Sequence, residues 1–321
     1  MNILISVVIC SYNPKPAYIK RVLEALKIQT LPRIQWELVL VDNASQKPLA
    51  DSIDLSWHPH ARHILEPQLG VVFARFRGLK ESQGAISIFV DDDNVLDPDY
   101  LHHALKISEN HPHLGVWGGQ STADFQGGTP EDWTRPMWPL LAIAQFDKDA
   151  WSNLDVSETM PVGAGMCIRK SVAQKYVDLV QSDPRRLTLG RRSDLLLSCE
   201  DFDIALAALD VELGLGRFSC LKLVHIMPIE RLSEGYLLKL VKGIVYSRAI
   251  MDFLRNRPQD QLSWRRKVRY FLSSWLMSPR DRRFLKATKQ AQHLAAKQIQ
   301  KMQVDPDDSI VALPVYQHIK I

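Results

Sequence analysis

The sequence predicts an α/β fold in which a mostly parallel central sheet is flanked by helices. Apolar, β-branched segments alternate along the first hundred residues with segments of helical periodicity. The strand-like segments end in polar residues, and open α/β sheets bind ligands at the carboxyl ends of their strands. The clearest of these junctions is residues 85–90, an apolar run that leads directly into Asp91, Asp92 and Asp93.

The expected elements follow from the spacing of the apolar residues and from the turn residues between them. Residues 3–10 are apolar and β-branched, residues 11–14 are turn formers, and residues 17–29 then take up helical spacing. Further along, the pattern predicts helices at 71–83, 100–109, 204–209, 234–255 and 264–301, and strands at 36–41, 85–90, 114–119 and 161–168.

The composition is that of a globular protein with one large domain and an appendage. The chain has 321 residues, a net charge of +4 and 46% hydrophobic residues. This mild basicity suits an anionic ligand or membrane surface and does not argue for nucleic acid. The four cysteines form no C-x-x-C pair, so we expect neither a zinc site nor a disulfide framework and infer a reducing, cytoplasmic setting. Residues 1–6 resemble a first strand rather than a signal peptide, and no apolar run is long enough to span a membrane.

The acid cluster after residues 85–90 is the main candidate for chemistry. Three adjacent carboxylates repel one another, and a divalent cation that bridges to phosphates would hold them together at a sheet edge. The alternative is a solvated, acid-rich turn. Between about 119 and 151 the chain becomes irregular, with tryptophans among prolines, and a long loop of this sort is more often functional than filler.

Six short motifs occur in an order that resembles the family-two glycosyltransferases. They are residues 6–13, 38–45, 74–78, 89–93, 163–166 and 200–201. Each motif is weak alone, whereas six in order make chance agreement improbable. The resemblance covers about residues 3–250 and implies the GT-A fold, a Rossmann-like catalytic domain. It also implies an inverting, typically metal-dependent and hexosyltransferase-like enzyme.

The resemblance assigns the first two strand ends to the nucleotide. It implies that the loop of Ser11, Tyr12 and Asn13 holds the base together with Asp42, and that Arg75 lies close to the base and phosphates. From the residues alone, Asp42 would belong to an ordinary strand-end turn. The alternative for Arg75 is a surface cation on an amphipathic helix. The asparagine that the family usually carries after this arginine is Phe76 here.

The acid cluster matches the D-x-D motif of the family. The resemblance implies that Asp91 contacts the ribose or the metal, that Asp92 lies at the nucleotide, and that Asp93 is a direct ligand of Mn²⁺ or Mg²⁺. His225 matches a late histidine that would be a further metal ligand, and Arg231 would touch the diphosphate. A lone histidine is otherwise usually structural.

Inverting transfer requires a carboxylate that removes the proton of the attacking hydroxyl. Asp201 matches the catalytic position of the family, with Glu200 the next candidate, although acids at a helix start are often only dipole partners. The segment expected beneath the sugar and the acceptor is Gly163, Ala164, Gly165 and Met166, for which a tight turn is an equal explanation.

These expectations combine into one reading of the chain. Residues 1–228 would form the catalytic domain, with nucleotide and acceptor halves at about 1–97 and 98–228, and residues 229–321 a mostly helical C-terminal region. The enzyme would transfer a sugar from a nucleotide-diphosphate donor to a glycan or lipid-linked acceptor, in bacterial surface-polysaccharide synthesis. Cations among C-terminal aromatic residues suggest peripheral contact with an anionic inner membrane surface, or else solvated helix faces: Arg265, Arg266, Lys267, Arg269, Arg280, Arg282 and Arg283.

Two rival functions remain open at this point. A haloacid-dehalogenase-type phosphatase would use Asp91 as nucleophile and Asp93 as acid, but some ninety residues of unexplained strands precede the motif. A non-catalytic module of the same fold would bind nucleotide or glycan without turnover, yet it would have no need of Asp201. Rapid hydrolysis of an aryl phosphate would identify the phosphatase. Binding of the nucleotide donor without any turnover would identify the binding module.

Overall fold

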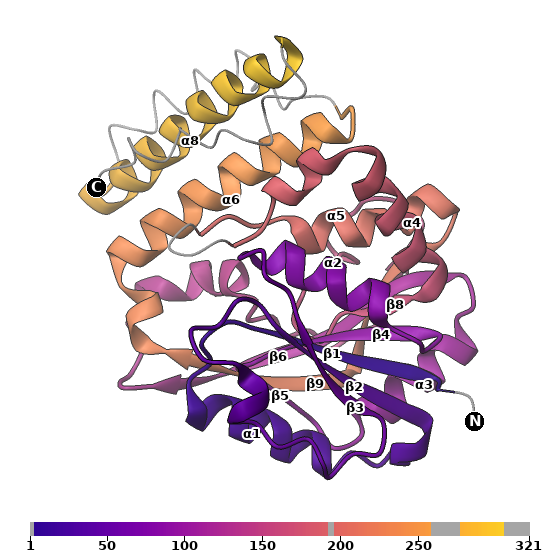
Figure 1. Cartoon of the computed structure of the whole chain (residues 1–321). Coiled ribbons are helices and arrows are strands. Elements are labelled where there is room, and N and C mark those ends of the chain that lie inside the picture. Colours follow the sequence, from indigo (N-terminus) through magenta and orange to yellow (C-terminus); the bar gives the residue numbers. More distant parts are fainter. Residues whose placement is uncertain (1–2, 192–195, 258–276, 305–321) are drawn as a thin grey trace. The chain divides into compact units, whose positions relative to one another are not determined.

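A computed structural model of the chain describes residues 3–191, 196–257 and 277–304 (Figure 1). The chain divides into two compact units, each with its own internal packing. The first unit comprises residues 1–182 and 200–232, and the second comprises residues 183–199 and 233–321. Residues 183–199 thus belong to the second unit although the chain on both sides of them belongs to the first.

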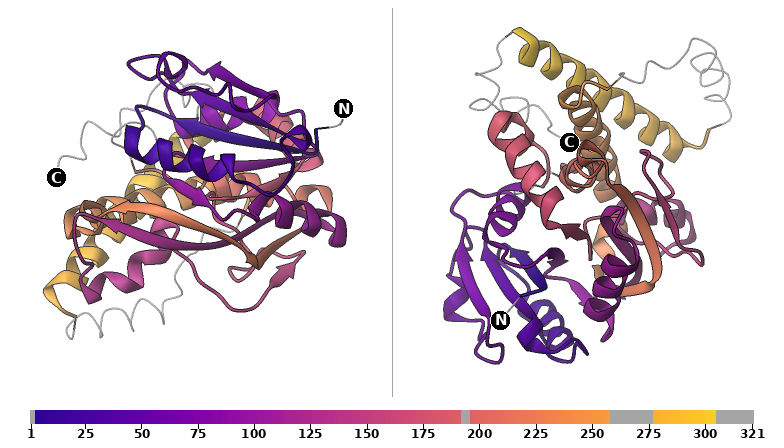
Figure 2. Two further views of the ribbon diagram at one scale, coloured as in Figure 1. Left: turned by 90° about the horizontal axis from the view of Figure 1, so that it is seen from below. Right: turned by 90° about the vertical axis from the view of Figure 1, so that its right-hand side faces the viewer.

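The strands of the first unit form one sheet in the order β3-β2-β1-β4-β8-β6-β9-β5, with β7 also paired to β9 (Figures 1 and 2). Neighbours among β3, β2, β1 and β4 are parallel, as the sequence predicts, whereas β8, β5 and β7 run antiparallel to their neighbours. Parallel neighbours need a crossover connection, usually an α-helix, whereas β6 and β8 are joined through the 3-10 helix η3 (Asp132–Leu141) and β7, without an α-helix. The strands are β1 (Ile5–Ser11), β2 (Trp36–Asp42), β3 (Ala61–Leu65), β4 (Ile86–Asp91), β5 (Asn94–Leu96), β6 (Leu114–Gln126), β7 (Ala150–Ser152), β8 (Cys167–Arg169) and β9 (Gly214–Pro228).

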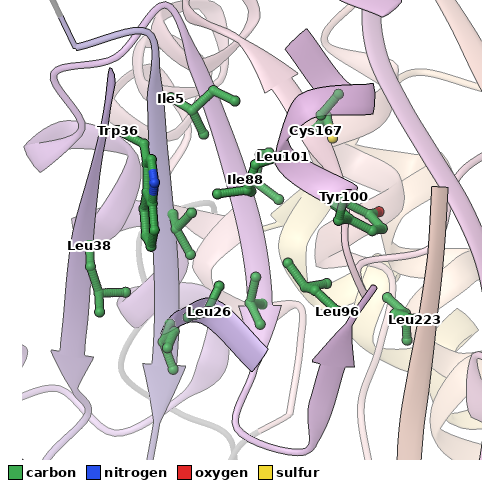
Figure 3. Packing of buried hydrophobic residues seen from close by; sticks show 14 of the residues in the cluster. Ile5, Leu26, Trp36, Leu38, Ile88, Leu96, Tyr100, Leu101, Cys167 and Leu223 are labelled. Atoms are coloured by element: carbon green, nitrogen blue, oxygen red, sulfur yellow. The ribbon is translucent and has the colours of Figure 1, made fainter. Parts of the chain in front are cut away.

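Helices cover both faces of this sheet, and alternate residues of the buried strands face the two layers. Ile5 and Ile88 belong to the core cluster beneath α1 and α3 (Figure 3). On the other face α2 packs so closely on β1 that a side chain on Gly78 would overlap Val8. The helices of the first unit are α1 (Pro16–Lys27), α2 (Val71–Glu81), α3 (Tyr100–Asn110), α4 (Lys170–Ser182) and α5 (Glu200–Leu206).

The second unit is helical. It contains the short 3-10 helix η4 (Pro184–Thr188), α6 (Glu234–Leu254) and α8 (Pro279–Val304). Phe284 and a row of alanines make up most of the buried face of α8, which packs along α6. Arg283 forms an ion pair with Glu234 at the start of α6. Residues 264–276 of the predicted helix at 264–301, with Arg265, Arg266, Lys267 and Arg269, lie outside the described residues, and α8 begins at Pro279.

The α/β prediction is confirmed, and the differences concern short or polar elements. The strand β3 was not predicted because Arg62 and His63 interrupt its apolar pattern at the sheet edge. Helix α4 and the strands β5, β7 and β9 were also not predicted, and β6 extends further than the predicted strand at 114–119. The glycine segment at 161–166 is a loop that leads into β8 rather than a strand.

Candidate active site

The strand register brings the predicted nucleotide residues to one edge of the sheet. Ser11 at the end of β1 pairs with Asp42 at the end of β2, and Cys10 pairs with Asp91 at the end of β4. The loops after these three strands therefore begin side by side, as expected for the ligand-binding edge of a parallel sheet.

The loops after β1 and β2 are joined by hydrogen bonds from backbone N–H groups to side-chain oxygens. Asn13 Oδ1 accepts a bond from Gln46 N–H at 2.9 Å, and Asn13 N–H donates to Ser45 Oγ at 3.0 Å. The carboxylate of Asp42 accepts from Ser45 N–H and Leu49 N–H, each at 2.9 Å. Asp42 thus shapes its own turn, and its contact with a nucleotide base stays a prediction.

Asn43 is a site residue that the sequence did not single out. Its Nδ2 donates to Gln68 O at 2.6 Å, and its Oδ1 accepts from Gly70 N–H at 2.8 Å. Gly70 is the residue before α2 and has a φ of +143°, so Asn43 fixes the entry to the helix that carries Arg75. The sequence signal that could have identified Asn43 is an asparagine directly after a strand-end aspartate. This pair is also common in ordinary turns, so it did not distinguish a site residue.

Arg75 is buried at the centre of the site and joins two acids from distant parts of the chain. Its Nη2 lies 3.1 Å from Asp91 Oδ1, and its Nη1 lies 3.1 Å from Glu200 Oε1. Only 4% of Arg75 is exposed, so it is not a surface cation. Burial by itself lowers the pKa of Arg75, but the carboxylates of Asp91, Glu200 and Asp201 outweigh burial and raise that pKa above its ordinary value. The guanidinium therefore links the end of β4 to the start of α5.

The acid cluster is partly buried and closely packed. Asp92 accepts a hydrogen bond from Ser11 Oγ at 2.5 Å. Burial raises the pKa of Asp92 to about 7, and the nearby charges of Asp93 and Asp91 add to this effect. Asp93 is buried rather than solvated, and its Oδ2 lies 3.3 Å from Arg231 Nη1 and 3.4 Å from His225 Nε2.

The three predicted metal ligands are not brought together. Asp91 is bound to Arg75, whereas Asp93 is paired with His225. In the part of the chain that the structure describes, no group of three or more His, Cys, Asp or Glu side chains could hold a metal ion. The chemistry of the site nevertheless fits a hard divalent cation. Carboxylate oxygens and an imidazole nitrogen are suitable ligands, and a cation would neutralise the negative charges of Asp93 and Asp91, which add to the effect of burial on the pKa of Asp92.

The opposite side of the site is formed by the first turn of α5 and the glycine loop. Asp201 Oδ2 accepts from Gly163 N–H at 2.9 Å, and Asp201 Oδ1 accepts from Phe202 N–H at 2.9 Å. A side chain on Gly163 would place its Cβ 2.7 Å from Arg75 Nη1. A side chain at position 163 would therefore have to displace the guanidinium of the buried arginine.

The second glycine of this loop is required by its backbone. Gly165 has a φ of +73°, and its carbonyl accepts a 2.7 Å hydrogen bond from Tyr100 Oη. Its N–H donates to Phe89 O at 2.9 Å, which anchors the loop on β4. Ala164 and Met166, between and after these glycines, are buried. These contacts account for the glycines as a tight turn, and a role of the loop beneath a sugar stays a prediction. The sequence did not identify Tyr100 as a site residue, because an aromatic residue at the start of a helix such as α3 is usually part of the core.

A mixed α/β fold with acids and cations at the carboxyl edge of its parallel strands is typical of proteins that bind a ligand at that edge. Residues 6–177 match the model of the family described as glycosyl transferase family 2. The chain belongs to this family. The family assignment confirms the resemblance drawn from the six motifs and overturns the phosphatase alternative.

Individual relatives support the same assignment. The chain is 35% identical over 190 residues to glycosyltransferase AglE of Haloferax volcanii, with 58% of each protein covered. It is 28% identical over 149 residues to the uncharacterized protein y4gI of Sinorhizobium fredii, over 42% of this chain and 16% of that protein. The matches thus span less than two thirds of these curated relatives.

Solved structures share the fold at low sequence identity. TarS residues 1–349 of S. aureus in complex with UDP-GlcNAc aligns with a TM-score of 0.52 and 16% identity, over 89% of this chain and 79% of that one. GalNAc-T7 with UDP, GalNAc and Mn²⁺ aligns with a TM-score of 0.51 and 19% identity, over 84% of this chain and 54% of that one.

Proposed function

We propose that this glycosyltransferase moves a sugar with inversion from a nucleotide-diphosphate donor to a hydroxyl of a glycan or lipid-linked acceptor. The observation that carries the proposal is the hydrogen-bonded connection between the acid cluster and α5. Arg75 joins Asp91 to Glu200, and the next residue, Asp201, presents a carboxylate held by Gly163. Donor-side cations and a candidate base thus share one site.

The donor would bind at the carboxyl edge of β1, β2 and β4. The loop of Ser11, Tyr12 and Asn13 would face the base with Asp42, and Tyr12 is 42% exposed and therefore open to a ligand. Asp92 would lie at the ribose or phosphates, and Arg231 would neutralise part of the diphosphate charge. UDP-GlcNAc bound to the fold neighbour TarS supports a nucleotide sugar as the donor class.

Asp93, His225 and Asp91 would hold Mn²⁺ or Mg²⁺, and Asp91 would then exchange its ion pair with Arg75 for the cation. When bound, the cation would stabilise the negative charge that develops on the departing diphosphate. The Mn²⁺ in the fold neighbour GalNAc-T7 supports this cofactor class. In this chain, Arg231 contributes a further positive charge within 3.3 Å of Asp93 Oδ2.

Asp201 would act as the general base. Gly163 N–H and Phe202 N–H orient its carboxylate, which would take the proton of the acceptor hydroxyl. The hydroxyl oxygen would then attack the anomeric carbon from the face opposite the diphosphate, which inverts the configuration. Gly163, Ala164, Gly165 and Met166 would line the sugar and acceptor positions. Glu200 is engaged with Arg75 and is the weaker candidate for the base.

Thermal unfolding with a panel of nucleoside diphosphates tests the proposal. We expect one of UDP, GDP or dTDP to raise the Tm by several degrees with Mn²⁺ present, because a ligand at about 100 times its Kd stabilises the folded state by about 2.7 kcal/mol. EDTA should remove most of this shift. The matching nucleotide sugar should then be hydrolysed slowly without acceptor.

Two results of this experiment would contradict the proposal. If no diphosphate changes the Tm with or without Mn²⁺ and no nucleotide sugar is consumed, the donor class is wrong. If binding occurs but neither hydrolysis nor transfer is measured with any acceptor tested, the non-catalytic binding module is the better interpretation.

We also propose peripheral contact between α8 and an anionic membrane surface. No helix in the described part of the chain is both long and apolar enough to cross a bilayer. Asp281 is the one acidic residue of α8, which is otherwise rich in cations. The cations on this helix are Arg280, Arg282, Arg283, Lys286, Lys289, Lys297 and Lys301.

Vesicle co-sedimentation tests this contact. We expect the protein to sediment with phosphatidylglycerol vesicles at low salt and to be released at high salt, because salt screens surface charges. The double variant Lys286→Gln and Lys289→Gln should bind more weakly. Equal sedimentation with neutral phosphatidylcholine vesicles would contradict an electrostatic contact.

A further inference from the structure

The chain passes from the second unit to the first immediately before the proposed base. Cys199 is the last residue of segment 183–199, which belongs to the second unit, and Glu200 is the first residue of α5 in the first unit. Asp201 follows directly. The position of the first turn of α5 therefore depends on where the residues just before it are held.

Inside the second unit, those residues lie backbone to backbone on α6. A Cβ added to Gly243 would stand 2.6 Å from the carbonyl carbon of Leu196 and 3.3 Å from Leu197 N, with the Leu196 carbonyl oxygen closer still. Any side chain at position 243 would have to displace the main chain of this segment. By contrast, a Cβ on Gly235, in the first turn of the same helix, meets nothing within 4 Å.

A hydrogen bond one turn further along α6 fixes the same segment. Ser247 Oγ accepts from Ser198 N–H at 3.1 Å, and Ser247 is 1% exposed. Residues 243 and 247 are four apart and so lie on one face of the helix. This face of α6 thus holds residues 196–198 by close packing and by a hydrogen bond.

Cys199 shows that the connection is tight. Its φ of +75° is a conformation that side-chain-bearing residues rarely adopt, and such residues persist where the structure on both sides fixes them. On one side, Ser198 is bound to α6. On the other side, the buried Glu200 is bound to Arg75 and Asp201 is bound to Gly163. A shift of residues 196–198 would therefore be passed to the α5 carboxylates.

We propose that Gly243 and Ser247 of α6 are positioning residues for the catalytic carboxylate, because they set the place from which the chain enters α5. This inference rests on the proposed role of Asp201. A displacement of the entry would disturb the orientation of the Asp201 carboxylate, while the loops after β1 and β2 that face the nucleotide stay as they are. The consequence is a loss of turnover without a loss of donor binding.

The experiment compares Gly243→Ala with Gly235→Ala, two identical changes in one helix. For the nucleotide sugar identified by the panel, we expect Gly243→Ala to lower kcat at least tenfold with KM for the donor changed less than twofold. Gly235→Ala should keep both values. Hydrogen–deuterium exchange of the peptide that covers residues 197–206 should be faster in Gly243→Ala and unchanged in Gly235→Ala.

Ser247→Ala gives a second measure, because it removes the hydrogen bond without adding bulk. We expect a lower kcat and a faster exchange, both by less than in Gly243→Ala. If Gly243→Ala does not fold, this variant alone tests the positioning role. If the folded variants show a lower Tm but wild-type kcat and wild-type exchange in α5, the two residues are merely structural and the inference is overturned. The exchange measurement needs no turnover. If the wild-type protein is inactive, the proposed function is therefore contradicted, while the exchange rates still test whether Gly243 and Ser247 position the first turn of α5.

Discussion

Replacing Asp201 with asparagine is expected to reduce sugar transfer about a thousandfold while donor binding stays within a few fold of the wild-type value. The amide has the size of the carboxylate but cannot take a proton from the acceptor, and general-base catalysis typically contributes 10² to 10⁴ in rate. Initial rates with the cognate nucleotide sugar measure the first effect. The Tm shift with its nucleoside diphosphate and Mn²⁺ measures the second.

Glu200→Gln is the comparison that identifies the base. Because Glu200 Oε1 is paired with the buried Arg75, its replacement should act mainly through stability and by a smaller rate effect than Asp201→Asn. Turnover that survives in Asp201→Asn and disappears in a folded Glu200→Gln variant would assign the base to Glu200 instead.

Arg75→Met is expected to cost about 3 to 5 kcal/mol in the free energy of unfolding at pH 7.5. The substitution keeps an apolar side chain of similar length but leaves the buried carboxylate of Glu200, and that of Asp91, without their counter-charge. Urea unfolding followed by circular dichroism measures the difference.

The deficit of Arg75→Met should depend on pH. Without the guanidinium, burial raises the pKa of Glu200 in the folded variant above the value of about 4.3 that glutamate has in an unfolded chain. Above that pH the unfolded variant has lost this proton and the folded variant retains it, so the variant loses stability as the pH rises. The deficit should therefore be smallest near pH 4 and largest above neutrality.

Arg77→Met is the matched control on the same helix. Arg77 forms a partly exposed ion pair with Glu81 at 3.0 Å, and surface pairs contribute at most about 1 kcal/mol. Its unfolding free energy should stay close to the wild-type value at every pH. Equal losses for the two arginine variants would refute the central role assigned to Arg75.

Much of the fold could be predicted from the sequence because its signals are local. The buried strands β1, β2 and β4 are continuous apolar runs, and α1, α2 and α3 have helical spacing. Elements without such a signal were missed. The edge strand β3 contains charged residues, and β5 has only three residues. The antiparallel direction of β8 relative to β4 and β6 also has no local signal in the sequence. It depends on where the chain rejoins the sheet after the irregular connection that follows β6.

The candidate site divides in the same way. Asp91, Asp93 and Asp201 could be selected from motifs, since a strand end or a helix start is visible in a few consecutive residues. Their partners could not. Asp42 was expected to face a base, yet its two oxygens shape its own turn, which only the loop conformation reveals.

The sequence by itself determined that the chain is an α/β protein of the family-two glycosyltransferases, because strand runs, helical spacing and motif order are properties of neighbouring residues. Only the tertiary structure decided that Arg75 joins Asp91 to Glu200, and that the backbone of Leu196 packs directly against Gly243. Contacts between residues so far apart in the chain form only after helices have packed on their sheet or on their neighbouring segments, and no local pattern specifies which faces will meet.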